Sequence, residues 1–113
     1  MSHCGWNSTL ESVVNGGVPL IAWPLYAEQK MNAVMLMEGA GIAIRAVTGE
    51  DGLVRREEVV RVVKALMEEE DGREVKERVR RLQVEGKKAL GEGGSSYKAL
   101  LEVTEMWRTP KKP

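Results

Sequence analysis

A short, uninterrupted apolar run at residues 18–23, VPLIAW, constrains the fold of this chain most. Two glycines precede the run and Pro24 follows it, so the segment is too short for a helix and predicts a strand. Because polar residues do not alternate with the apolar ones, both faces of the strand are expected to be buried, as in a parallel sheet. A second strand is predicted at residues 42–47.

Helical patterns surround these two strands. Apolar residues spaced by three and four predict helices over residues 7–15, 27–38, 55–70, 73–90 and 95–107. We expect Asp71-Gly72 to separate the third helix from the fourth, and Ser95 or Ser96 to cap the last one. The alternation of helices and strands predicts an α/β layer with parallel strands.

The composition divides the chain near residue 50. The first part, residues 1–47, holds most of the glycine, proline and tryptophan, whereas the helical part, residues 55–107, is rich in charged residues. Three Trp, two Tyr and no Phe leave the core to Val, Leu, Ala, Met and Ile. We therefore expect a site-bearing first half and a solvated helical second half.

Charge and cysteine content exclude several classes of protein. The 17 basic and 17 acidic side chains give a formal charge of 0, which argues against nucleic-acid binding. The single cysteine excludes an internal disulfide. The sequence has no signal-peptide pattern and no apolar run of bilayer length, so we expect a cytoplasmic protein without membrane association.

The segment before the first predicted helix, SHCGWNS, carries the chemistry of an anion site. A helix N-terminus exposes unpaired N–H groups and a partial positive charge. Gly5 allows a ligand to approach the backbone closely, and His3, Asn7 and Ser8 add side-chain donors. These features predict a phosphate site, although Asn7 or Ser8 is also expected to cap the helix.

Three further polar side chains suit a sugar. Glu11 lies one turn into the first helix, where a carboxylate can accept hydrogen bonds from a diol; it could equally be the acid of a capping box. Glu28 and Gln29 open the second helix directly after the strand, at the same edge of the sheet. A carboxylate and an amide there can bind hydroxyl groups, or be ordinary first-turn residues.

Several short segments match one known pattern in order and spacing: His3-Cys4-Gly5-Trp6-Asn7-Ser8, Glu11-Ser12, Gly17-Val18-Pro19, Trp23-Pro24 and Glu28-Gln29. Together they resemble the plant secondary-product glycosyltransferase box of plant UDP-dependent glycosyltransferases. MNAVML, GLVRREEVVRVVKALMEEE and GGSSYKALLEV are similar to the same family, and hydroquinone (arbutin synthase-like) glucosyltransferases resemble the chain most. The resemblance implies part of the Rossmann-like C-terminal domain of a GT-B enzyme.

The resemblance also implies a role for each site residue. His3, Asn7 and Ser8, with the close approach at Gly5, would hold the diphosphate of a UDP-sugar. Trp6 would line the sugar end of the site, partly through its backbone N–H, and Glu11 would bind the ribose hydroxyls.

The last two residues of the pattern imply the transferred sugar. Glu28 and Gln29 would bind its hydroxyls, and Gln at the final position goes with glucose in this family. The implied reaction is inverting transfer of glucose from UDP-glucose to a hydroxyl of a small phenolic acceptor. The family uses no metal or other cofactor, and the sequence offers no cluster of metal ligands.

The chain departs from the family pattern in two ways. The front of the box and the N-terminal domain, which carries the histidine base and the acceptor pocket, have no counterpart. We therefore expect an N-terminally truncated piece with no catalytic residue. There are two alternatives: a non-catalytic remnant with weak or no donor binding, or a helical interaction module at residues 55–107.

The second departure is the pair Gly16-Gly17, which is one glycine longer than usual in the family. Either the extra residue stays in the turn, or it shifts the strand and displaces Glu28 and Gln29.

Overall fold

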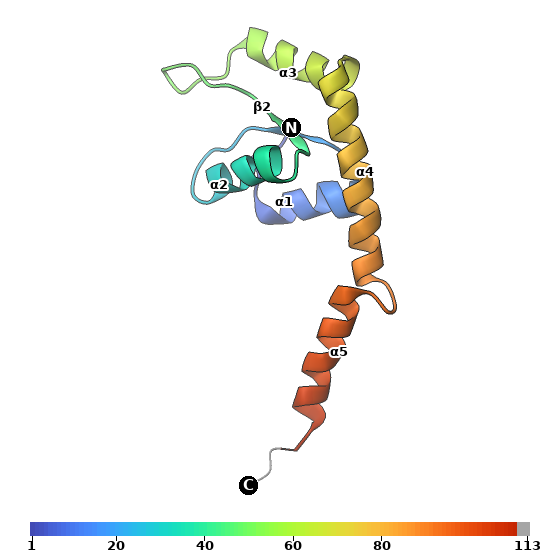
Figure 1. Ribbon diagram of the computed structural model, residues 1–113. Helices are drawn as coiled ribbons and strands as arrows, with labels where there is room; N and C mark the ends of the chain where they lie inside the picture. The colour runs from blue at the N-terminus through green and yellow to red at the C-terminus, as the bar shows by residue number, and fades with distance from the viewer. Residues whose placement is uncertain (111–113) are drawn as a thin grey trace. The chain divides into compact units, whose positions relative to one another are not determined.

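The computed structural model describes residues 1–110 of the chain. Its elements, in chain order, are α1 (Trp6–Leu10), the π-helix η1 (Glu11–Gly16), β1 (Leu20–Ala22), α2 (Gln29–Val34), the π-helix η2 (Met35–Gly39), β2 (Ala43–Arg45), α3 (Arg56–Glu68), α4 (Glu70–Leu90) and α5 (Ser95–Arg108) (Figure 1). The predicted order of helices and strands is confirmed, with strands shorter than the apolar runs. Two compact units divide the chain, Met1–Gln83 and a second that begins at Val84.

The sheet is parallel, as the alternation of elements predicts. β1 pairs with β2 in register, with Ile21 opposite Ile44. On the other side of β1, Ser2 forms a single parallel bridge to Ala22; its N–H donates to the Ile21 carbonyl, and its own carbonyl accepts from Trp23. Ser2 therefore lies beside β1, and because the bridge is parallel, the segments that follow Ser2 and β1 leave the sheet at the same edge.

The core of the first unit is aliphatic. All three residues of β1 are buried, which confirms that both faces of this strand are covered. The other buried apolar side chains come from the loop before α1, from η1, α2 and η2, from β2 and its flanks, and from α3 and α4: Cys4, Val13, Ala33, Leu36, Ile42, Ala43, Ala46, Val62, Ala65, Leu66, Val75 and Val79. The expectation of methionine in the core is wrong for Met31 and Met35, which are exposed.

The extra glycine lies at the end of the first helix. Gly16 is the last residue of η1, and Gly17, with φ of +60°, ends it. The Val18 N–H donates to the carbonyl of Ser12, six residues earlier, one residue more than in the usual glycine-ended turn. A π-helix accommodates one additional residue in this way. Gly16 and Gly17 therefore both lie at the end of η1, before β1.

The boundary between α3 and α4 differs from the sequence expectation. Asp71 and Gly72 lie inside the first turn of α4, and the break falls at Glu69, whose backbone is extended. A Cβ at Gly72 would overlap the carbonyl oxygens of Ala65 and Leu66. Gly72 therefore permits a close approach of two helices and does not interrupt one.

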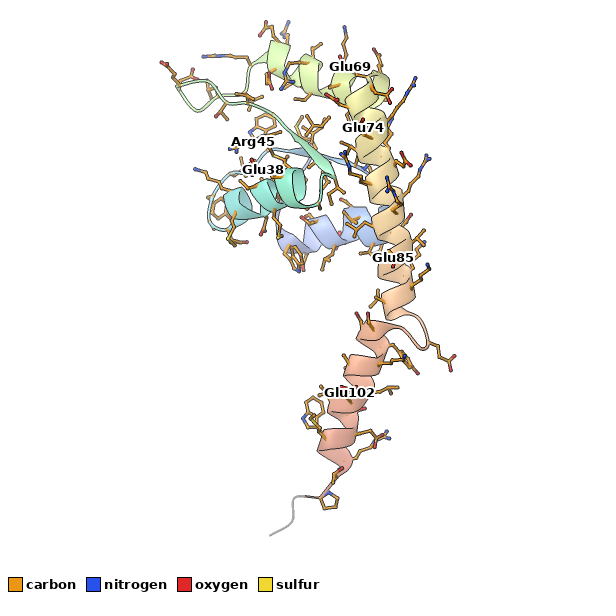
Figure 2. The ribbon with its side chains drawn as sticks, viewed as in Figure 1. Glu38, Arg45, Glu69, Glu74, Glu85 and Glu102 are labelled. Carbon is orange, nitrogen blue, oxygen red and sulfur yellow. The ribbon has the colours of Figure 1, made fainter. Side chains whose placement is uncertain are left out.

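The second unit holds the end of α4 and the whole of α5. Gly94, and neither Ser95 nor Ser96, is the N-cap of α5, so the predicted serine cap is wrong. No residue of α5 is buried, and Glu102 is one of the charged side chains that it carries (Figure 2). In the first unit, Glu74 on α4 is likewise exposed. Within residues 1–110, none of the helices is both long enough and apolar enough to cross a membrane.

Candidate functional site

Residues 2–5, which we term the entry loop, connect the sheet to α1. Cys4 is fully buried and has a positive φ of 69°, which is uncommon for a residue with a side chain. Its N–H donates to Ser2 Oγ at 3.1 Å, and its carbonyl accepts a buried hydrogen bond from Asn32 Nδ2 at 2.9 Å. These two bonds support the left-handed turn that directs the chain from Ser2 into the helix.

The His3 ring lies against the backbone of Gly5. The Gly5 N–H donates to His3 Nδ1 at 2.8 Å, and a Cβ at Gly5 would overlap Cε1 of the ring. A side chain at residue 5 would therefore displace the imidazole from this position. His3 itself is exposed, so the rest of its ring is accessible to a ligand.

The N-terminus of α1 has free N–H groups. Gly5 is the N-cap, and within the described part of the chain no side chain caps the helix. Asn7 and Ser8 lie inside the first turn, so the expectation that either caps α1 is wrong. The N–H groups of Trp6, Asn7 and Ser8 precede the first intrahelical bond, which Thr9 makes to the Gly5 carbonyl. An anion at this end would meet three unpaired donors.

A hollow of about 360 Å³ opens beside the entry loop. Its walls come from both segments that leave the sheet at this edge: Met1, Ser2, His3, Trp23 and Leu25. The structure thus brings His3 to the edge at which the strand β1 ends. Trp6, at the start of α1, is half exposed.

The three sugar-directed residues differ in their surroundings. Glu11, in η1, and Glu28, the N-cap of α2, are exposed, so both carboxylates are open to solvent. Gln29 is buried, and its Oε1 accepts from the N–H groups of Leu25 at 3.0 Å and Tyr26 at 3.1 Å. The oxygen of this amide is therefore occupied, and only its Nε2 remains as a donor.

Sequence reasoning missed Asn32. This residue is 6 % exposed and lies in the middle of α2, and its amide joins that helix to the entry loop. Asparagine is unfavourable inside a helix unless its side chain has a hydrogen-bond partner. Its position within the predicted helix 27–38 was therefore the available signal for such a contact. The helix that begins beside Glu28 and Gln29 is thus tied to the loop that carries His3.

The remaining titratable groups at this edge are few. Burial raises the pKa of the Cys4 thiol, and a backbone hydrogen bond from Trp23 and the charge of Arg45 oppose that effect only in part. Cys4 is a small, fully buried residue. Among residues 1–110, no group of three or more His, Cys, Asp or Glu side chains is placed to hold a metal ion.

In open α/β sheets, ligands bind outside the carboxyl ends of the parallel strands, which is the edge where His3 lies. Residues 1–84 match the family model described as UDP-glucoronosyl and UDP-glucosyl transferase, and the chain belongs to this family. UDP-glycosyltransferase 72B2 of Arabidopsis thaliana is 59% identical over 109 residues, which are 96% of this chain and 22% of that protein. Hydroquinone glucosyltransferase of Rauvolfia serpentina is 56% identical, over 95% of this chain and 23% of that protein.

The fold agrees with that of solved plant relatives. The structure of UGT2 from Phytolacca americana matches with a TM-score of 0.90 and 51% identity, over 95% of this chain and 24% of that one. The expected fold class, part of the C-terminal domain of a GT-B glycosyltransferase, is confirmed. The chain spans less than a quarter of the length of these relatives.

Proposed function

We propose that residues 3–29 form part of the donor site for UDP-glucose. The proposed reaction is inverting transfer of glucose to a hydroxyl of a small phenolic acceptor in the cytoplasm, with no metal. The observation that carries the proposal is the uncapped N-terminus of α1 beside the exposed ring of His3.

The diphosphate of the donor would bind at this end of α1. Its oxygens would accept hydrogen bonds from the N–H groups of Trp6, Asn7 and Ser8 and from the imidazole of His3. Gly5 leaves the backbone accessible, and the partial positive charge of the helix end attracts the anion. Stabilising the charge on the departing diphosphate would favour transfer of the sugar.

Carboxylates and an amide would bind the two sugars. Glu11 would accept hydrogen bonds from the ribose hydroxyls, one turn along the helical segment that holds the diphosphate. Glu28 would accept from hydroxyls of glucose, and Gln29 would donate from Nε2, because its Oε1 is held by Leu25 and Tyr26. Trp6, half exposed at the start of α1, would border the sugar.

The relatives support this choice of donor and acceptor. The Phytolacca americana enzyme has been solved in complex with UDP-2fluoro-glucose and pterostilbene. The Rauvolfia serpentina relative is named for hydroquinone. Both acceptors are phenols, and we therefore expect a phenolic hydroxyl to accept glucose from the protein that contains this chain.

Thermal unfolding and calorimetric titration of the purified chain with UDP-glucose test the donor site. Saturating ligand at about 100 times Kd would raise the free energy of unfolding by about 2.7 kcal/mol. His3→Ala and Glu11→Ala are expected to abolish the rise in Tm. Glu102→Ala, at an exposed position on α5, is the matched control and should retain it.

Two results would decide against the proposal. Titration without heat and without a change in Tm would exclude a donor site in this chain. A rise in Tm that persists in both site variants would place the ligand elsewhere. Binding of UDP-glucose without glucosylation of hydroquinone is the outcome expected of a chain that holds only part of the donor site.

A further inference from the structure

The peptide group between Cys4 and Gly5 has hydrogen-bond partners on both of its sides. Its carbonyl, that of Cys4, accepts from the buried Nδ2 of Asn32 at 2.9 Å. Its N–H, that of Gly5, donates to Nδ1 of His3 at 2.8 Å. In a trans peptide these two groups point in opposite directions within the peptide plane, so Asn32 and His3 lie at opposite edges of one rigid plane.

From this arrangement we propose that Asn32 is a positioning residue that acts, through the Cys4–Gly5 peptide, on the tautomer and orientation of the His3 ring. The proposal rests on the donor site proposed above. Asn32 fixes the direction of the carbonyl and therefore of the N–H. That N–H then selects which nitrogen of the imidazole carries hydrogen.

The chemistry of imidazole makes this selection definite. A neutral ring has one donor and one acceptor nitrogen. Because Gly5 donates to Nδ1, this nitrogen must be the acceptor, and the hydrogen of His3 is on Nε2. While the bond is in place, Nδ1 is occupied as an acceptor. His3 therefore offers a phosphate oxygen the N–H of Nε2 as its donor.

The surroundings of the peptide hold it in place. Asn32 is almost fully buried in α2, and Cys4, fully buried, keeps a positive φ that it would not adopt readily without support. Ser2 Oγ accepts from the Cys4 N–H. Because Gly5 has no side chain, the imidazole of His3 has room next to the Gly5 N–H. Hydrogen bonds on both sides of one peptide also polarise each other, which strengthens both.

Nitrogen NMR of the intact chain tests the proposal without any ligand. His3 is the only histidine of the sequence, so the imidazole signals need no assignment. We expect hydrogen on Nε2 only, and a scalar coupling across the hydrogen bond between the Gly5 amide nitrogen and Nδ1. A folded chain that lacks this coupling, or that carries hydrogen on Nδ1, overturns the proposal.

Two isosteric variants test the role of Asn32. Asn32→Asp replaces the donor with an acceptor that faces the Cys4 carbonyl, and it should abolish the coupling and weaken UDP-glucose binding roughly tenfold. Asn15→Asp adds the same charge at an exposed position and should change neither. If the coupling survives in Asn32→Asp, the role of Asn32 is refuted. If Asn32→Asp does not fold, the wild-type spectrum still decides whether the peptide holds the ring.

A titration of the labelled chain with UDP-glucose separates this inference from the donor site. A shift of the Nε2 signal with an unchanged coupling supports both. An unchanged Nε2 signal with the coupling intact refutes the donor site and leaves the positioning by Asn32 standing. A shifted Nε2 signal in a chain without the coupling supports the donor site and refutes the positioning.

Discussion

Gly72, in the first turn of α4, lies against the carbonyl oxygen of Leu66 near the end of α3, and no space for a side chain remains between them. Helix propensity alone would make Gly72→Ala stabilising by about 1 kcal/mol. The overlap with backbone atoms reverses the sign, and we expect a loss of roughly 2–3 kcal/mol.

Urea unfolding of Gly72→Ala measures this loss. Gly86→Ala, in the interior of the same helix, is the control, and it should leave stability unchanged or raise it by up to about 1 kcal/mol. A Gly72→Ala variant as stable as the wild type would show that the two helices separate there at little cost.

Gly17→Ala is expected to destabilise the first unit by about 2–3 kcal/mol. The residue has φ of +60°, a conformation that costs an alanine about 1–2 kcal/mol. A Cβ would also overlap the side-chain amide of Gln83, whose Nε2 donates to the carbonyls of Val14 at 3.3 Å and Asn15 at 3.2 Å. Displacing Gln83 loses these bonds, at about 1 kcal/mol.

Gly52→Ala isolates the backbone contribution. Gly52 has φ of +78° and no atom within 4 Å of a Cβ. Gly52→Ala should therefore lower the free energy of unfolding only by the cost of the left-handed backbone, about 1–2 kcal/mol. Thermal unfolding of the two variants measures the difference, which we assign to Gln83. Equal losses would remove Gln83 from the explanation.

Gln29 should stabilise the fold through its Oε1 and bind the sugar through its Nε2, and two substitutions separate these roles. Gln29→Met leaves the N–H groups of Leu25 and Tyr26 without their acceptor, and we expect a loss of about 1–3 kcal/mol in the free energy of unfolding. Gln29→Glu retains an acceptor oxygen and should lose less. It also lacks the Nε2 donor, so calorimetry should show weaker binding of UDP-glucose and unchanged binding of UDP. Equal affinity of Gln29→Glu and wild type for UDP-glucose would contradict a contact between Nε2 and the sugar.

The stability of the chain should depend on pH through Glu58. Hydrogen bonds from Arg61 and from the Val47 N–H lower the pKa of its carboxyl from 4.5 to about 2. A lowered pKa in the folded state means that the unfolded chain binds the proton more readily. This contribution to stability is therefore complete above pH 4.5 and is lost as the pH falls through about 2.

Glu58→Gln is the variant that reports this effect. The Tm of the wild type should exceed that of Glu58→Gln near pH 6, and the gap should narrow steadily below pH 4.5. Glu57→Gln, at an exposed neighbouring position, provides the baseline. A gap that stays constant down to pH 2 would show that the carboxylate does not stabilise the folded state.

Local patterns in the sequence predicted the elements well and the contacts between them poorly. The run VPLIAW identified β1 as a strand with both faces buried because burial on two faces leaves no polar alternation. Asn7 and Ser8 carry good capping chemistry, yet α1 begins at Trp6 and its N-cap is Gly5. The left-handed turn at Cys4 sets that start, and its hydrogen-bond partner Asn32 lies 28 residues away.

Contacts between distant parts of the chain also determine the roles of the glycines and the geometry of the candidate site, and local sequence patterns do not predict such contacts. Gly72 looks like a helix breaker in sequence, whereas its role comes from the carbonyls of another helix. The candidate site residues were predicted from the order and spacing of a family pattern, and the same pattern reveals the extra glycine. The π-helix η1, which ends at this pair of glycines, has i→i+5 bonds that a search for a 3.6-residue period does not detect.

The burial of Cys4 makes its thiol a reporter of loop opening. Only the thiolate attacks an alkylating reagent, and burial both raises the pKa of this thiol and shields the sulfur. Alkylation must therefore wait until residues 2–5 leave the sheet edge. Since Cys4 is the only cysteine in the chain, the rate of modification counts these openings directly, at a position one peptide away from the proposed phosphate site.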